Sequence, residues 1–316
     1  MSSAILVAVS GSQADDWFEQ LCAQAPDRDI RRWPQCVGNP AEIDYACVWR
    51  PPHGLLAGLP RLKAIISLSA GVDHVLADPS LPKVPLARAV HPDLTARMTE
   101  YVVLHVLMHH RRQRLYDAQQ RERLWHGHDQ PSAGEVTVGI MGLGTIGSEI
   151  ASVLGRIGFK VAGWSRTLKH VAGVESFHGE HGLDAFLAHT DILVCLLPHT
   201  PATEGMLDLT LLRKLRRDGA LGGAFLVNAA RGKLQVNADI LAALDEGALS
   251  GVTLDVFPTE PLPADSPLWA HPKITITPHN AGDLSPRTLA SAVLAQIDRL
   301  ERGETLRHLV DRAAGY

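Results

Sequence analysis

Val138-Gly-Ile-Met-Gly-Leu-Gly-Thr-Ile-Gly147 is the stretch that decides the fold of this chain. It joins an apolar, strand-like run to the pattern Gly142-x-Gly144-x-x-Gly147, and a helical pattern follows it. In such a turn Gly142 permits the sharp bend, Gly144 lets a pyrophosphate approach the backbone, and Gly147 lets the helix pack closely against the sheet. The free N–H groups at the helix N-terminus attract phosphate. The motif therefore predicts a dinucleotide-binding site at Gly142, Gly144, Thr145, Ile146 and Gly147.

The residues after the next predicted strand, Lys160–Trp164, indicate which dinucleotide is bound. An NAD-binding chain usually places Asp or Glu about 20 residues after the glycine motif, where the carboxylate holds the ribose 2′-hydroxyl. This chain has no acidic residue there and instead presents polar and basic side chains suited to a 2′-phosphate. We therefore expect NADP as the preferred cofactor and NAD as the less favoured one, bound by Ser165, Arg166, Thr167 and Lys169.

Short apolar runs alternate with helical patterns along most of the 316 residues, as in parallel sheets with crossover helices. From Val138 onward the runs are continuously apolar, which is typical of strands buried on both faces. This alternation predicts an α/β fold with two doubly wound parallel sheets. The expected strands are Ala4–Val9, Ala46–Trp49, Ala64–Leu68, Thr137–Met141, Lys160–Trp164, Ile192–Leu196, Ala224–Asn228, Gly251–Val256 and Ile274–Thr277.

Two predicted helices define the domain organisation. Asp93–Trp125 carries apolar residues at helical spacing and is expected to be one long helix that leads from one domain to the next. Ser285–Leu300 is also helical in pattern, follows the last strand, and is expected to return to the N-terminal domain. We therefore predict a Rossmann NAD(P)-binding domain of residues 98–283, inserted into a flavodoxin-like substrate domain of residues 1–97 and 284–316.

Composition and charge exclude several classes of partner. The chain has 30 Lys and Arg against 34 Asp and Glu, a net charge of -4 and no long basic run, so we expect neither nucleic acid nor an anionic membrane as a partner. No apolar run approaches the roughly 20 residues of a membrane helix, and Met1–Ser10 lacks the basic start and cleavage-like end of a secretion signal. The 4 cysteines have no metal-like spacing and are expected to stay reduced. These observations favour a cytoplasmic protein.

Charged residues follow three of the later predicted strands, at the sheet edge where ligands bind in this kind of fold. They are Arg231, Glu260 and His279. Hydride transfer to a 2-oxo acid needs a cation that binds the carboxylate and polarises the carbonyl, and an acid that protonates the new alkoxide. Arg231 and His279 can supply these functions. A carboxylate such as Glu260 beside His279 would favour the imidazolium ion and orient the ring.

The order of these three residues, together with the glycine motif, resembles the D-2-hydroxyacid dehydrogenases, and the resemblance covers nearly the whole chain. It implies that Arg231 binds the substrate, that Glu260 pairs with His279, and that His279 is the acid/base. It also implies that backbone N–H groups of the segment Ser67–Asp73 bind the substrate carboxylate. The residues implied for the substrate are Trp49, Ser69, Ala70, Gly71 and Val72, and the further residues implied for the cofactor are Leu197, Pro198, Thr203, Ala229, Ala230, Asp255 and His279.

Shorter strings resemble one branch of this family more closely, among them Val48-Trp-Arg-Pro-Pro52, Gly163-Trp-Ser-Arg166 and Val310-Asp-Arg-Ala-Ala-Gly-Tyr316. The resemblance implies NADPH-dependent reduction of glyoxylate, hydroxypyruvate or another small 2-oxo acid to the D-2-hydroxy acid, by a homodimer. Polar Asn280 departs from the family pattern and leaves the substrate open, so a dehydrogenase for another 2-hydroxy acid stays an alternative. Formate dehydrogenases have Gln where Glu260 stands, which argues against that activity. A nucleotide-sensing, co-repressor-like binding protein of the same fold is the alternative from another functional class.

The chain has 16 histidines, which raises the question of a metal site. His105 and His109 are four residues apart on the predicted long helix, but the Glu of an H-E-x-x-H motif and a third ligand are missing, so we expect no metal. The segment from His109 to Arg112 is instead expected to form a polar helix face or a subunit contact. His74 lies beside the predicted substrate loop and is a weaker candidate for ligand contact. We expect only His279 to take part in the chemistry.

Overall fold

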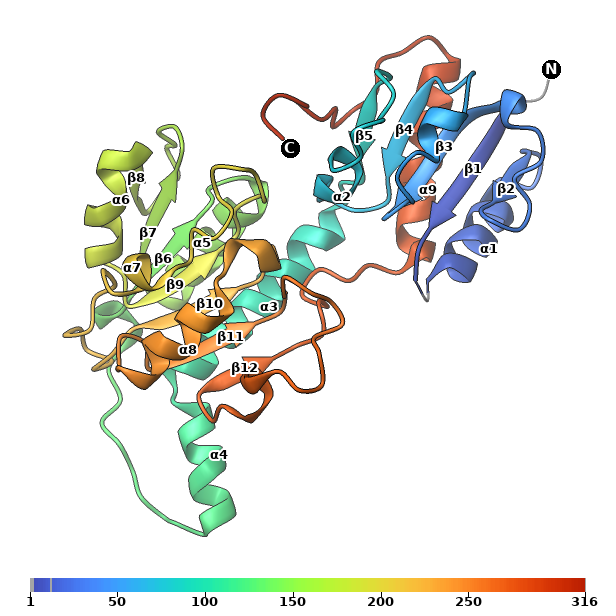
Figure 1. Ribbon diagram of the computed structural model, residues 1–316. Helices are drawn as coiled ribbons and strands as arrows, with labels where there is room; N and C mark the ends of the chain where they lie inside the picture. Colours follow the sequence, from blue (N-terminus) through green and yellow to red (C-terminus); the bar gives the residue numbers. More distant parts are fainter. Residues whose placement is uncertain (1–2, 12, 316) are drawn as a thin grey trace. The chain divides into compact units, whose positions relative to one another are not determined.

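The structure is a computed structural model of the chain, and it describes residues 3–11 and 13–315. The chain divides into two compact units. The first unit consists of the residues up to Leu94 together with those from Leu284 onward, and the second unit consists of Thr95–Asp283. Each unit contains one parallel sheet and its own hydrophobic core (Figure 1).

The sheet of the first unit has the strand order β2-β1-β3-β4-β5, and all neighbouring strands in it are parallel. This order is the flavodoxin-like form of the doubly wound fold and confirms the predicted fold class. The sequence analysis does not predict β2 and β5, because each has only 3 residues and no distinctive apolar run. The strands are β1 (Ala4–Val9), β2 (Ile30–Arg32), β3 (Ile43–Trp49), β4 (Ala64–Ser67) and β5 (Leu86–Arg88).

Helices cover both faces of this first sheet (Figure 1). The helices α1 (Ala14–Gln24) and α9 (Pro286–Glu301) pack against each other on one face, where Leu21 and Val293 are buried. The short helix α2 (Asp73–Leu76) covers the other face with the 3-10 turn at residues 56–58. Because α9 comes from the C-terminal part of the chain, segments far apart in the sequence build the first unit.

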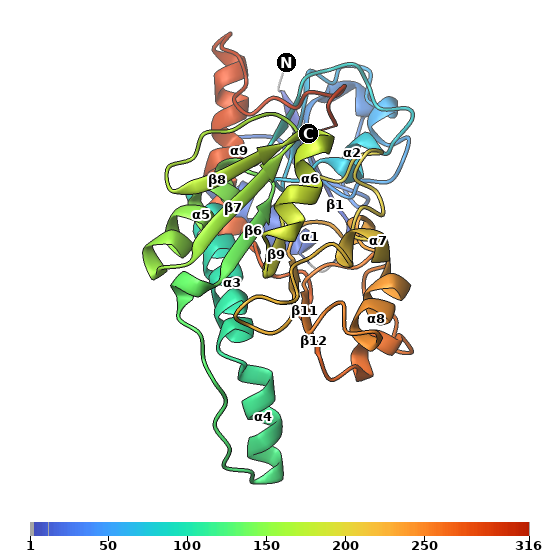
Figure 2. The same cartoon turned by 90° about the vertical axis from the view of Figure 1, so that its left-hand side faces the viewer.

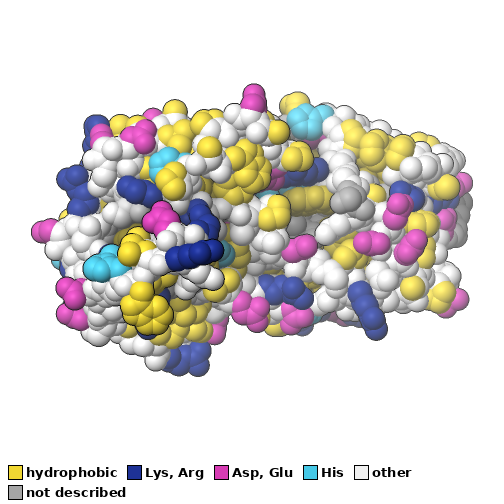
Figure 3. All heavy atoms as spheres, turned by 90° about the horizontal axis from the view of Figure 1, so that it is seen from below, with side chains coloured by type: hydrophobic (Ala, Val, Ile, Leu, Met, Phe, Trp, Pro, Cys, Tyr) yellow, Lys and Arg dark blue, Asp and Glu magenta, His cyan; other side chains and the backbone are white. Residues whose placement is uncertain are grey.

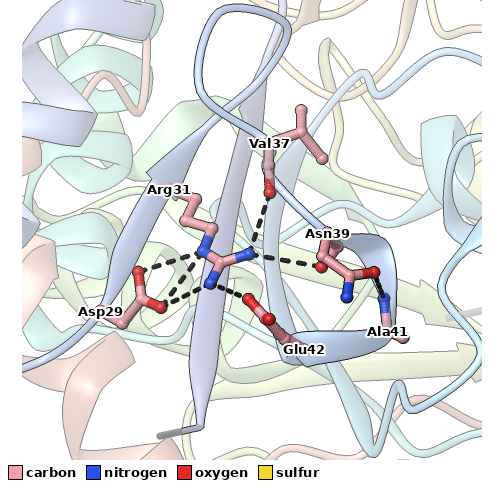
Figure 4. A network of polar contacts seen from close by, with 6 residues as sticks. All are labelled: Asp29, Arg31, Val37, Asn39, Ala41 and Glu42. Atoms are coloured by element: carbon pink, nitrogen blue, oxygen red, sulfur yellow. Dashed lines mark hydrogen bonds and ion pairs between the residues drawn. The ribbon is translucent and has the colours of Figure 1, made fainter.

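The guanidinium group of Arg31 on β2 holds the loop that leads from β2 to β3 (Figure 4). Its Nε donates to the carboxylate of Asp29, and its Nη2 donates to Asp29 and to Glu42. Its Nη1 donates to the carbonyl oxygens of Val37 and Asn39. The planar fork of five donors in Arg is therefore fully used, which a lysine could not reproduce.

Backbone atoms near the C-terminal end of the described chain cover the outer edge of β5. The N–H group of Val310 donates to the carbonyl oxygen of Leu86 at 2.9 Å, and the carbonyl oxygen of His308 accepts from the N–H group of Arg88 at 3.2 Å. An antiparallel bridge lies between these two bonds. The edge of the first sheet is thus paired beyond β5.

The sheet of the second unit has the strand order β12-β11-β10-β9-β6-β7-β8, again with parallel neighbours throughout. Counted from β6 as the first strand, this is the Rossmann order 3-2-1-4-5-6 with one further strand, which confirms the prediction. The sequence analysis does not predict β8, since its residues include Glu175 and Ser176 and are only partly buried. The strands are β6 (Thr137–Met141), β7 (Lys160–Ser165), β8 (Val174–His178), β9 (Ile192–Cys195), β10 (Phe225–Asn228), β11 (Gly251–Leu254) and β12 (Ile274–Ile276).

Alternate residues of these buried strands face two different helix layers. Leu254 on β11 belongs to the core under α6, α7 and α8, whereas its neighbour Thr253 bonds to His109 of α3. The first layer consists of α6 (Gly179–Ala188), α7 (Leu209–Leu212) and α8 (Asn237–Asp245), and the second layer contains α3 (Pro92–His110) and α5 (Thr145–Ile157).

The prediction of one continuous helix over Asp93–Trp125 is wrong. The structure has α3 as far as His110 and a separate α4 (Gln113–Glu122), because Arg112 adopts a left-handed backbone with φ of +56°. A left-handed residue turns the chain and interrupts the helical hydrogen bonds. Figure 2 shows α4 pointing away from the sheet of the second unit. None of the helices in the described part of the chain is both long and apolar enough to cross a membrane.

The expectation that the segment from His109 to Arg112 forms a polar helix face is wrong for His109 and His110. Both side chains are buried, and His105 on the preceding turn is buried as well. The Nε2 atom of His109 lies 3.0 Å from the Thr253 hydroxyl, and the Nδ1 atom of His105 lies 2.8 Å from the carbonyl oxygen of Tyr101. His105 thus bonds within α3, whereas His109 attaches α3 to β11.

Candidate active site

The glycine motif forms the turn between β6 and α5. Gly142 has a φ of +110°, and a Cβ atom on Gly147 would lie 2.0 Å from the Gly142 carbonyl oxygen, so the turn tolerates no side chain at Gly147. Gly144 is the N-cap of α5, and a Cβ there would meet no atom within 4 Å. No side chain caps this helix, which begins at Thr145 and Ile146. Open space in front of uncapped N–H groups fits a pyrophosphate.

Polar and basic side chains surround the end of β7. Ser165 is buried, and its hydroxyl donates to the carbonyl oxygen of Thr167 at 2.8 Å, so Ser165 shapes the turn. Arg166, Thr167 and Lys169 are exposed. The surface of this turn therefore offers two cations and a hydroxyl group, which suit a 2′-phosphate better than a ribose hydroxyl.

The predicted cofactor residues after β9 and β10 are largely buried. Leu197 is buried, and the Thr203 hydroxyl donates to the Pro198 carbonyl oxygen at 2.7 Å, which fastens this loop to itself. Ala229 and Ala230 are also buried at the end of β10. These loops therefore present backbone atoms and small apolar side chains to a bound ligand, because the Thr203 hydroxyl is already bonded within its own loop.

Glu260 and His279 come from the loops after β11 and β12 and lie in direct contact. The Nδ1 atom of His279 is 2.8 Å from Oε2 of Glu260, and Oε1 of Glu260 accepts from the Phe257 N–H group at 3.0 Å. The His279 side chain is 32% exposed and that of Glu260 is 17% exposed. The carboxylate is thus shielded and oriented, while part of the imidazole ring remains accessible to a ligand.

Arg231 lies on a loop that packs closely against the loop of Glu260. A Cβ on the adjacent Gly232 would lie 1.9 Å from the carbonyl carbon of Phe257, which shows how near the two loops are. The Nη1 atom of Arg231 donates to the carbonyl oxygen of Ala230 at 2.8 Å, and its side chain is half-buried. The second unit therefore gathers a cation, a carboxylate and an imidazole on adjacent loops at the carboxyl ends of its strands.

Asp255, which the sequence analysis assigns to the cofactor, directs its carboxylate into the loop of His279. Its Oδ1 accepts from the hydroxyl of Thr277 at 2.6 Å, and its Oδ2 accepts from the N–H group of Ala281 at 3.0 Å. The hydroxyl of Tyr101 on α3 lies 2.6 Å from the same Thr277 hydroxyl. Neither Tyr101 nor Thr277 is predicted as a site residue, because only the fold brings them together.

The predicted substrate residues of the first unit surround the carboxyl ends of β3 and β4. The Ser69 hydroxyl donates to the carbonyl oxygen of Gly71 at 2.6 Å, and Val72 is buried at the start of α2. This bond fixes the turn that contains Ala70. The ring of Trp49 meets that of His74 edge to face, with centroids 4.5 Å apart. These residues form one local cluster in the first unit.

Residues 3–11 and 13–315 contain no group of three His, Cys, Asp or Glu side chains that could hold a metal ion. His105 and His109 are spaced like a pair of metal ligands, but His105 bonds to Tyr101 and His109 bonds to Thr253. All four cysteines, Cys22, Cys36, Cys47 and Cys195, are free thiols.

Known proteins resemble this chain over its whole length. Residues 103–281 match the family described as D-isomer specific 2-hydroxyacid dehydrogenase, NAD binding domain. A glyoxylate/hydroxypyruvate reductase A of Yersinia enterocolitica is 40% identical over 310 residues, which cover 96% of this chain and 97% of that protein. Two solved structures align with this chain over the full length of both chains. One is an NADPH-dependent glyoxylate/hydroxypyruvate reductase of Sinorhizobium meliloti in complex with NADP and sulfate, with 43% identity and a TM-score of 0.94. The other is a probable 2-hydroxyacid dehydrogenase of Rhizobium etli in complex with NADP, HEPES and L(+)-tartaric acid, with 45% identity and a TM-score of 0.94.

Proposed function

This chain belongs to the D-isomer specific 2-hydroxyacid dehydrogenases, a family of oxidoreductases, and we propose from this that it reduces glyoxylate, hydroxypyruvate or a similarly small 2-oxo acid to the D-2-hydroxy acid with NADPH. The observation that carries the proposal is the contact of 2.8 Å between His279 Nδ1 and Glu260 Oε2. A hydride transfer enzyme of this kind needs such an acid, whereas a binding protein does not. The names of the related reductases support the choice of substrate.

Each of the three residues at the carboxyl edge of the second sheet has a distinct role in this proposal. NADPH, when bound, supplies the hydride that is added to the carbonyl carbon. Arg231 binds the carboxylate and polarises the carbonyl oxygen, where negative charge develops. Glu260 accepts a hydrogen bond from Nδ1 of His279 and thereby orients the imidazole ring. His279 then delivers a proton from Nε2 to the alkoxide, because Nδ1 is occupied by Glu260.

The first unit contributes substrate contacts in this proposal. The backbone N–H groups of Gly71 and Val72 bind the substrate carboxylate, and the bond from Ser69 to Gly71 supports the shape of their turn. Trp49, whose ring contacts that of His74, lines the substrate pocket. In domain terms, residues 1–97 and 284–316 act as the substrate domain and residues 98–283 as the NAD(P)-binding domain.

The cofactor is proposed to be NADP rather than NAD. The glycine turn and the N-terminus of α5 suit the pyrophosphate that both cofactors share. Arg166, Thr167 and Lys169 are exposed at the end of β7, where they would bind the additional 2′-phosphate. Related proteins of known structure contain NADP, which supports this choice.

The active form is proposed to be a homodimer that forms through α4 and the segment that follows it. Leu115, Leu124 and Trp125 expose 40%, 53% and 102% of their surface, respectively. Figure 3 looks at the molecule from the side to which α4 points and shows hydrophobic and basic side chains exposed close together there. Exposed apolar side chains on a projecting element favour contact with another subunit.

The four free cysteines favour a cytoplasmic location.

A panel of 2-oxo acids tests the proposal directly. The oxidation of NADPH is followed by its absorbance with glyoxylate, hydroxypyruvate and pyruvate, and the panel is repeated with NADH. We expect turnover, a higher kcat/KM with NADPH than with NADH, and a D-configured product when hydroxypyruvate is reduced. Binding of NADPH without turnover of any acid would overturn the proposal and favour a nucleotide sensor of the same fold.

A further inference from the structure

His279 has a backbone conformation that must be held by its surroundings. Its φ angle is +54°, in the left-handed region that residues other than glycine uncommonly adopt. Such a conformation persists only where neighbouring contacts determine it. The groups that fix this loop therefore also decide where the imidazole ring lies.

The carboxylate of Asp255 accepts hydrogen bonds from both sides of His279. Its Oδ1 accepts from the Thr277 hydroxyl at 2.6 Å and from the Asn280 N–H group at 3.0 Å, and its Oδ2 accepts from the Ala281 N–H group at 3.0 Å. The N–H group of His279 itself donates to the carbonyl oxygen of Asp255 at 2.8 Å. Asp255 is only 1% exposed, so water does not compete readily for these bonds.

Tyr101 of α3 completes this arrangement from another element. Its hydroxyl lies 2.6 Å from the Thr277 hydroxyl. A threonine hydroxyl has one proton, and that of Thr277 is donated to Asp255, so Tyr101 must donate to Thr277. Burial raises the pKa of Tyr101, which keeps its hydroxyl protonated and able to donate. Three side chains thus form a directed chain from Tyr101 through Thr277 to Asp255.

We infer that Tyr101 and Thr277 are positioning residues, which act through Asp255 to hold His279 in the conformation needed for proton transfer. The inference rests on the proposed role of His279 and extends it to two residues that need not touch substrate or cofactor. The two hydroxyl groups are expected to affect proton delivery and not cofactor binding, because the chain of hydrogen bonds ends on the loop of His279 and not on the glycine turn. Loss of the chain should therefore lower kcat and leave the binding of NADPH unchanged.

Three variants at two positions measure this effect. Thr277→Val removes the hydroxyl at nearly constant volume, and is expected to lower kcat roughly 10- to 100-fold, the usual cost of a small misplacement of a catalytic group. Thr277→Ser restores the hydroxyl and should recover most of the activity. Tyr101→Phe leaves Thr277 bonded to Asp255 and should cause a smaller loss of kcat.

A matched control comes from the same strand end. Thr275 lies two residues before Thr277 and bonds to Arg114, away from Asp255. Thr275→Val therefore makes the same chemical change outside the chain and should leave kcat unchanged. The Kd of NADPH, measured by protein fluorescence, should be the same in all variants and shows that each one is folded. The solvent deuterium isotope effect on kcat should increase in Thr277→Val and, to a smaller extent, in Tyr101→Phe, because proton transfer becomes slower in both, and it should stay unchanged in Thr275→Val.

The outcomes separate this inference from the proposed function. If the natural protein turns over no 2-oxo acid, the proposed function fails and the inference fails with it. If the natural protein is active but Thr277→Val and Tyr101→Phe both retain kcat within about twofold, only the inference fails. If Thr277→Val does not fold, the kcat of Tyr101→Phe decides. Equal losses in Thr277→Val and Thr277→Ser would also overturn it, since the hydroxyl would then have no role.

Discussion

His279 has two ring nitrogens with different surroundings. Its Nδ1 lies 2.8 Å from a carboxylate oxygen of Glu260, and an ionised carboxylate only accepts hydrogen bonds, so Nδ1 carries a proton. In the proposed mechanism Nε2 is then the atom that exchanges a proton with the substrate. We expect His279→Ala to lower kcat roughly 10²–10⁴-fold, the usual contribution of a general acid. Glu260→Gln keeps the hydrogen bond without the charge and should lose less. Steady-state kinetics across pH measures both, and a kcat near that of the natural protein at every pH would exclude the role.

Arg166 is proposed to determine the preference between the two cofactors. Its guanidinium is exposed at the end of β7 and suits a 2′-phosphate, whereas a carboxylate there would repel that group and bind a ribose hydroxyl. We expect Arg166→Asp to reverse the ratio of kcat/KM for NADPH to that for NADH, from above one to below one. Arg156→Asp, an equal change of charge at an exposed residue of α5, is the control and should keep the original preference. An unchanged ratio in Arg166→Asp would assign the phosphate to other residues.

Single residues of the site could be predicted where a local motif identifies them. Arg231, Glu260 and His279 each follow a recognisable strand, and the structure places Glu260 against His279. Tyr101 and Thr277 are 176 positions apart, and each is an ordinary hydroxyl residue in its own segment. Their contact exists only because α3 crosses the sheet next to β12. The residue pattern of neither segment predicts this contact.

The turn between β6 and α5 depends on the absence of a side chain at one position. A Cβ on Gly147 would lie 2.0 Å from the Gly142 carbonyl oxygen, so Gly147→Ala must move the helix or the turn. We expect this variant to lose most of its affinity for NADPH and to unfold at a lower temperature. Gly155→Ala is the matched change within α5, where a Cβ meets nothing within 4 Å.

Fluorescence titration with NADPH and thermal unfolding compare the two glycine variants. Gly155→Ala should bind NADPH normally and gain about 0.5–1 kcal/mol of stability, because alanine favours a helix. Equal NADPH affinity in the two variants would show that the close approach at Gly147 has no bearing on the cofactor.

The buried His109 on α3 makes the second unit sensitive to acid. Burial lowers the pKa of His109 from 6.5 to about 3, so the folded protein stays unprotonated there while the unfolded chain binds a proton below pH 6.5. The free energy of unfolding therefore decreases as the pH falls from about 6.5 toward 3, by up to about 1.4 kcal/mol per pH unit from this residue. Above pH 6.5 the contribution is fully present.

A variant that cannot titrate isolates this contribution. His109→Gln can still donate to Thr253, whose hydroxyl lies 3.0 Å from His109 Nε2. Urea unfolding at pH 7 and pH 5 should show a smaller loss of stability on acidification in His109→Gln than in the natural protein. His170→Gln, at an exposed loop position, should behave like the natural protein. The same loss in all three proteins would mean that His109 does not titrate on unfolding.

The elements themselves could be predicted to different degrees. Long apolar strands such as β1 and β6 have the bounds expected from the sequence. The break between α3 and α4 could not be predicted, because Arg112 is not a residue that usually adopts a left-handed backbone. The burial of His105 and His109 escaped prediction for a related reason: hydrogen bonds to Tyr101 and Thr253 make these two polar rings acceptable in the core.

At the scale of the whole molecule, the fold class could be predicted but the complete sheets could not. The alternation of apolar runs and helical patterns predicts two doubly wound sheets, and both strand orders agree with it. The strands β2, β5 and β8, which the sequence does not predict, are short or polar. They pair because longer neighbouring strands provide a template for them. Their positions follow from the assembled sheet and not from their own residues.

The proposed homodimer makes a prediction about molecular mass. Trp125 and Leu124 are among the most exposed large hydrophobic side chains of the described structure. Replacing both in the double variant Leu124→Asp, Trp125→Asp is expected to weaken the dimer, so that light scattering at low concentration reports the mass of one chain, 34.2 kDa. Ile157→Asp, at an exposed apolar position outside this segment, should remain a dimer. If light scattering gives the natural protein a mass of 34.2 kDa, which is that of one chain, the proposed homodimer is contradicted.

The backbone of residues 308–310 occupies hydrogen-bonding groups of β5 that would otherwise face solvent. An open edge strand is a template on which a strand of another molecule can add, and this addition is a common first step of aggregation. β2, at the opposite edge of the same sheet, is only 3 residues long and carries Arg31 and Arg32, which disfavour such pairing by length and by charge. The segment beyond α9 therefore closes the β5 edge of the first sheet to the addition of another strand.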